Sequence, residues 1–248
     1  MNLAFIDLET TGTDETNGSI LEIGAIVTDE ELQPLASWET LVDPQMAHVA
    51  DMAPVVREMH TASGLLDQLD RIAPELVANT APDGIRYLPD ADYRLAELLR
   101  PFTIRGQIVL AGSGVGHFDA RWIARHLPRT SKLLTFWTID VGVVRRFLSM
   151  LADVDIPTLN DRKPHRALDD VRLHLAEATV YRDALRAATS TINLEINRPR
   201  PGDRTDNAGQ PGTLIRCPRC SGDGLLHRPD HYPEASQADL SHRTPPPA

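Results

Sequence analysis

The first 42 residues constrain the fold most, because they contain three segments rich in aliphatic and β-branched residues that are separated by short polar turns. These segments span residues 3–8, 20–28 and 35–42. Such composition, bounded by turn residues, is typical of β-strands. We therefore predict that the chain begins with a strand and continues with its antiparallel neighbours.

After residue 90 the pattern alternates between helices and strands. Helical spacing of apolar residues covers residues 91–101, 119–127, 140–151 and 169–186, and strand-like segments cover residues 107–111 and 136–139. In the last helix we predict a buried stripe and a water-facing side. The stripe is Val171, Leu175, Ala178 and Leu185, and the water-facing residues are Arg172, Glu177 and Arg182. Strands followed by this alternation predict an α/β fold with a mixed β-sheet flanked by helices.

The composition limits the class of protein and its compartment. The 248 residues include no apolar run of 18 or more, which excludes a membrane-spanning helix and predicts no membrane partner. The residues before Asp7 include no basic leader, so we expect no secretory signal. Two cysteines are too few for a disulfide framework, and they fit a cytoplasmic protein.

The proline content rises near residue 198. Nine of the 19 prolines lie between residues 199 and 247, among Gly, Asp, Asn and Ser. Such a segment has too little apolar surface to offset the entropy lost on ordering. We predict one domain over residues 1–194 and a disordered, proline-rich C-terminal tail over residues 195–248, in which residues 214–231 are the stretch most able to order.

The net charge of −10 lies entirely in the predicted domain. Its 194 residues hold 18 Lys and Arg against 28 Asp and Glu, whereas the predicted tail holds seven of each sign. Proteins that grip long duplex nucleic acid by its phosphates are usually basic. Either the partner is not a polyanion, or bound divalent cations supply the positive charge locally.

Two acidic residues lie at the end of the first predicted strand. Asp7 and Glu9 are two residues apart, so both carboxylates project to one face of the strand and Leu8 projects to the other. A bound divalent cation would relieve the repulsion between two such charges. A pair of ordinary surface acids at a strand end is the simpler alternative.

Three further candidates lie at comparable junctions. Asp119 follows a glycine-rich loop and opens a helix, and His165 and Asp170 flank the start of the last helix. Each has an ordinary explanation: a helix cap, a loop histidine, and an acid favoured by the helix dipole. The joint occurrence of all five residues, in this order, favours a functional site.

The segments around these residues resemble the three exonuclease motifs of the DEDDh family. The motifs are Asp7-x-Glu9 followed by Thr-Thr-Gly, Gly-His-Phe-Asp119, and His165-x-x-x-x-Asp170. The flanking residues 20–24, 60–65, 139–141 and 181–183 are most similar to the oligoribonuclease branch. The resemblance covers residues 3–186 and implies a ribonuclease-H-like fold.

The resemblance also implies a role for each motif residue. Two Mg²⁺ or Mn²⁺ ions, which prefer oxygen ligands, would be held by Asp7, Glu9, Asp119 and Asp170. Asp7 would bridge the ions, and Glu9 and Asp170 would serve the ion on the side of the nucleophile. Asp119 would serve the other ion, and His165 would be the general base.

Several positions depart from the oligoribonuclease pattern around the substrate, where that branch has a leucine wedge, a tryptophan, an arginine and phosphate-capping hydroxyls. The altered positions are Thr13, Val55, Val115, Phe136, Trp137, Gly142 and Val144. These changes favour the entry of strands longer than dinucleotides. We predict substrate contacts by Thr10, Thr13, His60, Ser63 and Trp137.

Two readings of Phe136 and Trp137 stay open. Aromatic side chains stack on bases in single-strand channels. Alternatively both pack in the core, as aromatic residues flanked by apolar neighbours often do.

The predicted tail contains a possible metal knuckle over residues 217–231. Cys217-Pro-Arg-Cys220 is followed by His227 and His231. Two thiolates and two imidazoles could hold one Zn²⁺, and an unstructured pair of thiols is the alternative.

We therefore predict a metal-dependent 3′→5′ exonuclease. It would hydrolyse short or single-stranded RNA or DNA to nucleoside 5′-monophosphates by a two-metal-ion mechanism, and a homodimer is a possible assembly. The alternative is a proofreading-type or non-catalytic subunit that binds a polymerase through the tail, because proline-rich segments are common peptide ligands.

Overall fold

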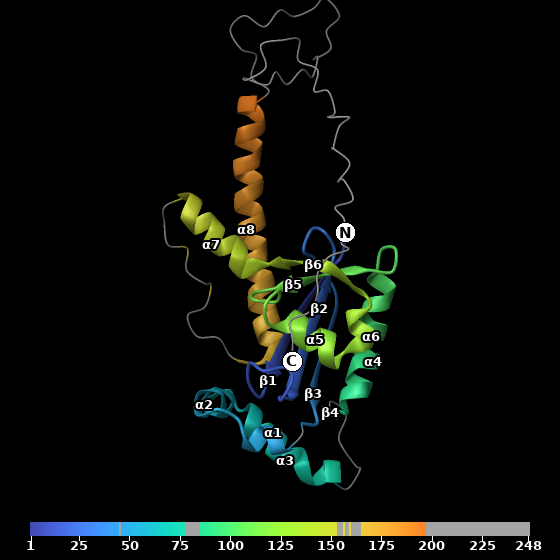
Figure 1. Cartoon of the computed structure of the whole chain (residues 1–248). Helices are drawn as coiled ribbons and strands as arrows, with labels where there is room; N and C mark the ends of the chain where they lie inside the picture. Colours follow the sequence, from blue (N-terminus) through green and yellow to red (C-terminus); the bar gives the residue numbers. More distant parts are fainter. Residues whose placement is uncertain (45, 78–84, 153–155, 157–158, 160–164, 197–248) are drawn as a thin grey trace, which may run out of the picture. The chain divides into compact units, whose positions relative to one another are not determined.

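The computed structural model describes residues 1–44, 46–77, 85–152, 156, 159 and 165–196. Six strands form one mixed sheet in the order β4-β3-β2-β1-β5-β6 (Figure 1). This is the predicted α/β fold with a mixed sheet flanked by helices. Within the sheet, β1 is central, so residues on it are covered by helices on both faces.

All the predicted strands are present, with bounds close to the predicted ones. Of the two predicted antiparallel neighbours of the first strand, the structure confirms residues 20–28 but not residues 35–42, which pair with residues 20–28 instead. β1 (Leu3–Thr10) runs antiparallel to β2 (Ile20–Thr28), and β2 runs antiparallel to β3 (Pro34–Val42), so β3 neighbours β2 and not β1. β5 (Ile108–Gly112) is parallel to β1, and β6 (Leu134–Asp140) is parallel to β5. The short β4 (Ile85–Arg86), which was not predicted, pairs parallel with β3.

All four predicted helices are present. They are α4 (Leu88–Leu99), α5 (Asp119–His126), α7 (Val141–Ala152) and α8 (Ala167–Ile196). α4 ends before the predicted residue 101 because the chain tightens into the 3₁₀ turn η1 (Arg100–Phe102), which contains a proline. The helices α1 (Met46–Ala50), α2 (Pro54–Ala62), α3 (Leu65–Val77) and α6 (Pro128–Ser131) were not predicted.

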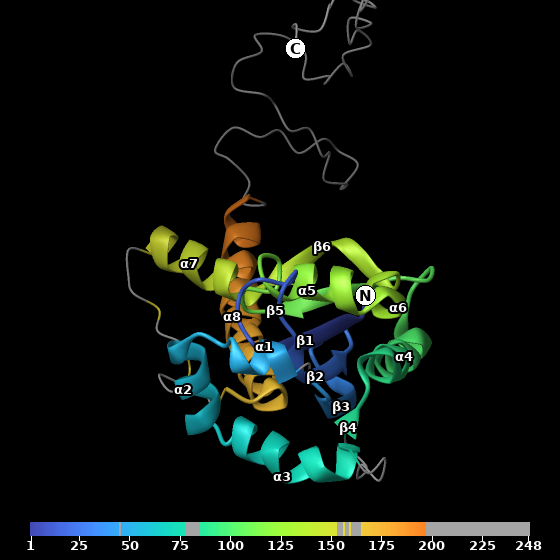
Figure 2. The same cartoon turned by 60° about the horizontal axis from the view of Figure 1, so that its bottom comes forward.

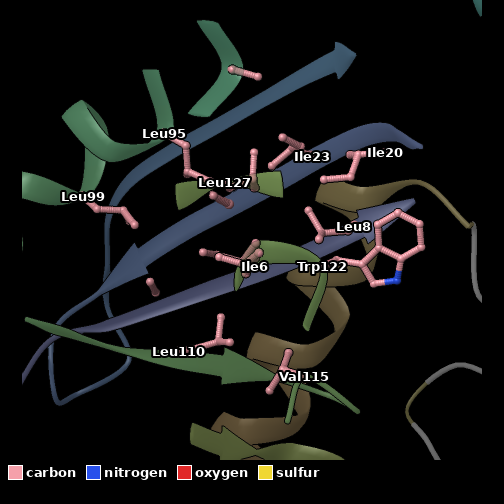
Figure 3. Close-up of a cluster of buried hydrophobic side chains, with 14 of the residues drawn as sticks. Ile6, Leu8, Ile20, Ile23, Leu95, Leu99, Leu110, Val115, Trp122 and Leu127 are labelled. Carbon is pink, nitrogen blue, oxygen red and sulfur yellow. The ribbon is translucent and has the colours of Figure 1, made fainter. Parts of the chain in front are cut away.

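One face of β1 lies in the main apolar core. Ala4, Ile6 and Leu8 project to the side of the sheet that α4 and α5 cover, and we call this side the core face. Figure 3 shows Ile6 and Leu8 of β1 near Trp122 of α5. These side chains are at most 4% exposed, so this face contributes mainly to stability.

The other face of β1 changes character along the strand. Leu3 and Phe5 pack against α7 and α8 in a second apolar cluster. Asp7 and Glu9 follow on the same face by strand alternation. We call this side, defined by Leu3, Phe5, Asp7 and Glu9, the carboxylate face.

The predicted faces of the last helix are partly wrong. Val171 is fully buried as predicted, but Leu185 is 42% exposed. Glu177, predicted to face water, is 5% exposed and accepts a hydrogen bond of 3.0 Å from the backbone N–H of Leu159. The difference arises because the backbone at Leu159 lies against this side of α8 and buries a residue that helical spacing alone leaves outside.

α1, α2 and α3 follow β3 and are grouped at one end of the sheet (Figures 1 and 2). Their buried contacts form a third apolar cluster, which consists of Leu21, Leu41, Met52, Leu65 and Leu69. The cluster holds α2 and α3 beside the ends of β2 and β3. α2 thereby brings His60, which is fully buried, to the end of β1.

The core reading of the β6 aromatics is wrong for Phe136. This side chain is 98% exposed, and Trp137 is 40% exposed. The reason is that β6 is an edge strand of the sheet. α7, which follows β6, also leaves four apolar side chains exposed: Val143, Phe147, Met150 and Leu151.

Among the described residues, no helix combines the length and the hydropathy needed to cross a bilayer. The predicted domain boundary at residue 194 falls within α8, which ends at Ile196. The remainder of the predicted tail lies outside the described residues, and so do Cys217, Cys220, His227 and His231.

Candidate active site

Three of the five motif residues converge at the end of the carboxylate face. Glu9 comes from β1, His165 lies two residues before α8, and Asp170 lies in the first turn of that helix. One possible ligand atom from each lies within 4.8 Å of the others. Glu9 is 6% exposed and Asp170 is 3% exposed. Two buried carboxylates this close, with an imidazole, form a donor set that suits a divalent cation.

Asp7 lies on the same face, beside α8. Its side chain is 14% exposed, and its Oδ1 is 4.0 Å from Nδ1 of the buried His174. His174 is four residues after Asp170, so both side chains lie on one side of α8. We did not single out His174 from the sequence, although this spacing could have identified it.

Asp119 approaches β1 from the opposite side, at the start of α5. It is not the helix cap considered above, because Phe118 occupies the cap position. Its Oδ1 accepts a hydrogen bond of 3.1 Å from the backbone N–H of Leu8. The parallel pairing of β1 with β5 extends only from Leu3 to Phe5, so the Asp119 carboxylate takes an N–H beyond this pairing. Asp119 is thereby fixed to the backbone of Leu8, the residue between Asp7 and Glu9.

A glycine allows α8 to lie close to the sheet. Gly24 on β2 is the register partner of Asp7. A Cβ atom at Gly24 would lie 2.4 Å from the backbone carbonyl carbon of Ala167 and 2.4 Å from the backbone N of Leu168. The first turn of α8, which carries Asp170, can therefore pack this closely against β2 only when residue 24 is glycine.

A buried carboxylate absent from our predicted site lies beside the three converging residues. Glu22 on β2 is the register partner of Glu9 and is 2% exposed. Its carboxylate accepts hydrogen bonds from the guanidinium of Arg166, the shortest being 2.7 Å, and from the backbone N–H of Ala167 at 3.0 Å. The pattern of β2 shows that Glu22 shares a face with Gly24, but its partners are 144 and 145 residues away in the sequence.

His60 lies behind Glu9. Its Nε2 donates a hydrogen bond of 2.8 Å to the backbone carbonyl of Thr10, and its Nδ1 is 3.7 Å from Oε2 of Glu9. Burial lowers the pKa of His60 below its ordinary value. The ring is fully buried, and its neighbour in the site is the carboxylate of Glu9. A role of His60 in substrate binding stays a prediction.

The other predicted substrate contacts differ in their surroundings. The hydroxyl of Thr10 donates to the carbonyl of Gly12 at 2.7 Å, and the hydroxyl of Ser63 donates to the carbonyl of His60 at 3.2 Å. Thr13 and Trp137 are exposed. These four assignments stay predictions.

Two of the positions that depart from the oligoribonuclease pattern have structural explanations. Val115 is fully buried in the core cluster. A Cβ atom at Gly142 would lie 2.7 Å from Oγ of Ser113. Neither position has room for a side chain that reaches outward without rearrangement of its neighbours.

Known proteins similar to this chain were found by sequence and by structure, although no family model matches it. The oligoribonuclease of Streptomyces avermitilis is 33% identical over 190 residues, which cover 74% of this chain and 86% of that protein. The oligoribonuclease of Vibrio parahaemolyticus is 29% identical over 185 residues, which cover 74% of this chain and 95% of that protein.

Exonuclease I of Methylocaldum szegediense has a similar fold, with a TM-score of 0.53 and 20% sequence identity. The match covers 73% of this chain and 40% of that one. Exonuclease I of E. coli, in a metal-free complex with single-stranded DNA, matches with a TM-score of 0.51 and 18% identity, covering 79% of this chain and 42% of that one. At these identities the structural likeness concerns the fold.

The fold, the order of the motifs and the sequence relatives agree with one another. Residues that the motifs place far apart in the sequence lie at one end of β1, and the two oligoribonucleases align with 74% of this chain. The chain therefore belongs to the oligoribonuclease family of DEDDh exonucleases and is a 3′→5′ exonuclease.

Proposed function

We propose that this exonuclease removes nucleotides from the 3′ end of short or single-stranded RNA or DNA and releases nucleoside 5′-monophosphates. The observation that carries the proposal is the convergence of Glu9, His165 and Asp170 within 4.8 Å. A site limited to binding would not need an imidazole beside two buried carboxylates. The convergence therefore supports hydrolysis.

Two Mg²⁺ or Mn²⁺ ions would be held by Asp7, Glu9, Asp119 and Asp170. The donor set fits these ions, because all four residues offer carboxylate oxygens and three of them are at most 6% exposed. When bound, such a pair of ions stabilises charge on the attacking and leaving oxygens of a phosphodiester. Two divalent ions bound there would also offset part of the negative charge of the domain.

The chain's own residues position the reacting groups. A nitrogen of His165 accepts a proton from the attacking water, which is the work of a general base. Asp119 is anchored to the N–H of Leu8, which fixes it relative to Asp7 and Glu9. Burial keeps the pKa of His60 low, so the ring next to Glu9 stays neutral and leaves the negative charge of Glu9 to a cation.

The exposed aromatic residues of β6 support a single-stranded substrate. Phe136 is 98% exposed and Trp137 is 40% exposed, so both rings are accessible for stacking.

A homodimer is also part of the proposal. Its support is the apolar surface of α7, formed by Val143, Phe147, Met150 and Leu151, because exposed apolar patches often mark protein contacts.

The test is a digestion of 5′-labelled RNA and DNA oligomers of increasing length, from dinucleotides upward, with Mn²⁺ or Mg²⁺. A ladder that shortens from the 3′ end, with release of 5′-monophosphates, is expected. EDTA should stop the reaction. The rates along the two length series then give the preferred sugar and the preferred length.

Neighbouring aspartates provide a matched control for this test. Asp170→Asn should abolish the ladder, whereas Asp169→Asn should keep it, because Asp169 is exposed and pairs with Arg172 at 2.6 Å. His165→Ala should lower the rate by about 10²–10⁴-fold, the usual contribution of a general base. An unchanged ladder in Asp170→Asn or His165→Ala would rule out the proposed site.

Three further expectations follow from the sequence, and the first two concern the C-terminal tail after Ile196, which lies outside the described residues. Zinc binding by Cys217, Cys220, His227 and His231 stays a prediction, and so does the polymerase-associated alternative. Deletion of residues 197–248 separates the alternatives, because a self-sufficient nuclease keeps its activity on short oligomers. A cytoplasmic location also stays a prediction.

A further inference from the structure

We infer that Glu22 and Arg166 form a clamp that holds His165 in place, and that both are positioning residues for the proton transfer. The inference rests on the proposed function of His165. The inference adds Glu22 and Arg166 to the residues of the site. Neither is a proposed metal ligand, and neither takes part directly in the reaction. Both act through the backbone that presents the imidazole.

The clamp joins β2 directly to the segment that presents His165. Nε of Arg166 donates to Oε1 and Oε2 of Glu22 at 3.2 and 3.0 Å, and Nη2 donates to Oε1 at 2.7 Å. The backbone N–H of Ala167 donates to Oε2 at 3.0 Å. Both carboxylate oxygens are therefore bound by the two residues that follow His165. Bidentate pairs of this kind fix orientation as well as distance.

The same segment also sets the start of α8. The backbone carbonyl of Arg166 accepts the hydrogen bond of 2.9 Å from the N–H of Asp170. Nη2 of Arg166 donates a further hydrogen bond of 2.7 Å to Gln68 on α3. Arg166 thus joins β2 and α3 through its guanidinium and the first turn of α8 through its backbone carbonyl.

His165 needs such support because its backbone is in an uncommon conformation. Its φ angle is +51°, in the left-handed region that side-chain-bearing residues rarely adopt. Conformations of this kind persist where the surroundings hold them. The bonds of the next two residues to Glu22, together with the close contact of Ala167 with Gly24, provide that constraint.

The clamp also explains why Glu22 is not a competing ligand. Glu22 is directly opposite Glu9 across β1 and β2, so its charge lies close to the metal-binding carboxylates. Its oxygens accept hydrogen bonds from a cation and a backbone amide. Hydrogen bonding to Glu22 raises the pKa of Arg166, so the guanidinium keeps its charge. The charge of Glu22 is therefore balanced by Arg166 and the amide of Ala167, and its carboxylate serves to position the segment after His165.

A pair that only stabilised the fold would behave differently from a positioning clamp. Its loss would lower the stability but leave the rate of each folded molecule unchanged. The discriminating measurement is therefore a double-mutant cycle with His165. Residues that act through one group lose their separate effects once that group is removed.

The test uses Glu22→Gln in the wild-type and His165→Ala backgrounds, in the full-length protein with Mn²⁺. In the wild-type background we expect kcat to fall about 10–100-fold with KM nearly unchanged, in line with losses of supporting contacts around metal sites. In the His165→Ala background we expect no further fall. An equal fall in both backgrounds would overturn the clamp, because Glu22 would then act independently of His165.

Asp92→Asn is the matched control for Glu22→Gln, because Asp92 is also a buried carboxylate that accepts hydrogen bonds from backbone amides. Asp92 is 2% exposed and accepts hydrogen bonds of 2.9 Å from the N–H groups of Arg129 and Thr130, which lie on α6. We expect this variant to lose stability while its kcat stays that of the wild type.

Arg166→Lys is the second clamp variant. It keeps the charge but cannot form the bidentate pair, so it tests the clamp if Glu22→Gln fails to fold.

A structural readout separates failure of the clamp from failure of the proposed function. In crystals or by NMR of histidine-labelled protein, the His165 ring should leave its position near Glu9 and Asp170 in Glu22→Gln and Arg166→Lys. Calorimetric Mn²⁺ affinity should fall by less than the about 10–100-fold fall in kcat. If the wild-type protein digests no oligomer, the proposed function fails, but displacement of the ring still supports the clamp. A ring that keeps its place in both variants would overturn the clamp whatever the activity.

Discussion

The two faces of β1 are built from alternate residues of one strand, yet they serve different ends. On the core face, Ala4, Ile6 and Leu8 are all apolar and at most 4% exposed. On the carboxylate face, the apolar Leu3 and Phe5 give way to Asp7 and Glu9. The neighbours Leu8 and Glu9 are similarly buried, at 4% and 6%, but one lies in packed hydrocarbon and the other beside Asp170 and His165.

This comparison shows how a small sheet accommodates several buried charges. The core face and the first part of the carboxylate face supply apolar burial, which is the main stabilising contribution to the fold. The end of the carboxylate face instead brings like charges together, which costs stability unless a cation is bound. Within β1 the candidate site residues thus lie at the end of one face, and substitutions of adjacent residues should separate activity from stability.

The largest effect is expected for Glu9→Gln. The side chain keeps its size but loses its charge, so the rate should fall about a thousandfold, which corresponds to about 4 kcal/mol of transition-state stabilisation. The stability of the metal-free protein should be equal to or higher than that of the wild type, because a buried like-charge contact is removed. The measurements are the rate on 5′-labelled oligomers and urea unfolding in EDTA. A large loss of stability would contradict the division between the faces.

Leu8→Ala tests the opposite face with the adjacent residue. We expect a loss of about 2–5 kcal/mol in the free energy of unfolding, the usual cost of a large-to-small substitution in a core. The rate per folded molecule should remain close to that of the wild type below the unfolding transition. The check is urea unfolding together with the rate, normalised to the folded fraction. A fall in rate as large as that of Glu9→Gln would remove the distinction.

Gly24→Ala is expected to affect both stability and rate. The new methyl group would press against the backbone of Ala167 and Leu168, so α8 must shift away from β2. Overpacking of this kind costs about 1–3 kcal/mol, and misplaced reacting groups lower the rate. Gly12→Ala is the control, because no atom lies within 4 Å of its added Cβ. Equal results for the two variants would mean that the approach of α8 does not depend on Gly24.

The smallest effect is expected for Tyr181→Phe in the apolar part of the carboxylate face. The Tyr181 hydroxyl is buried and has no hydrogen-bond partner among the described residues, so its removal should change the stability by less than about 1 kcal/mol, in the stabilising direction. Exposed Tyr93→Phe is the control. Thermal unfolding at neutral pH measures the difference, and a clear loss of stability would reveal a partner for the hydroxyl.

The same substitution changes the alkaline limb of the stability curve. Burial raises the pKa of Tyr181, so above about pH 10 the unfolded chain loses this proton before the folded chain does. The wild type should therefore lose stability as the pH rises through that range, and Tyr181→Phe should lose less. Parallel curves for the two proteins would contradict the burial effect.

The sequence predicted every strand of the sheet except β4, and the helices α4, α5, α7 and α8, because their signals are local. Alternation on β1 and helical spacing in α5 and α8 depend only on near neighbours. Glu177 was misplaced because the backbone of Leu159, which buries it, is not part of the helical pattern. Phe136 was left between two readings, since the composition of β6 does not reveal that it is an edge strand.

For the site, the sequence alone determined the chemical types, their order, and the common face of Asp7 and Glu9, because motif spacing and strand alternation are properties of the chain itself. The tertiary structure decided that Asp170 and His165 meet Glu9, that Glu22 is held by Arg166, and that His60 is buried behind the site. The reason is physical: these distances depend on how closely α8 packs against β2 at Gly24, and packing between segments remote in sequence leaves no local periodicity to detect.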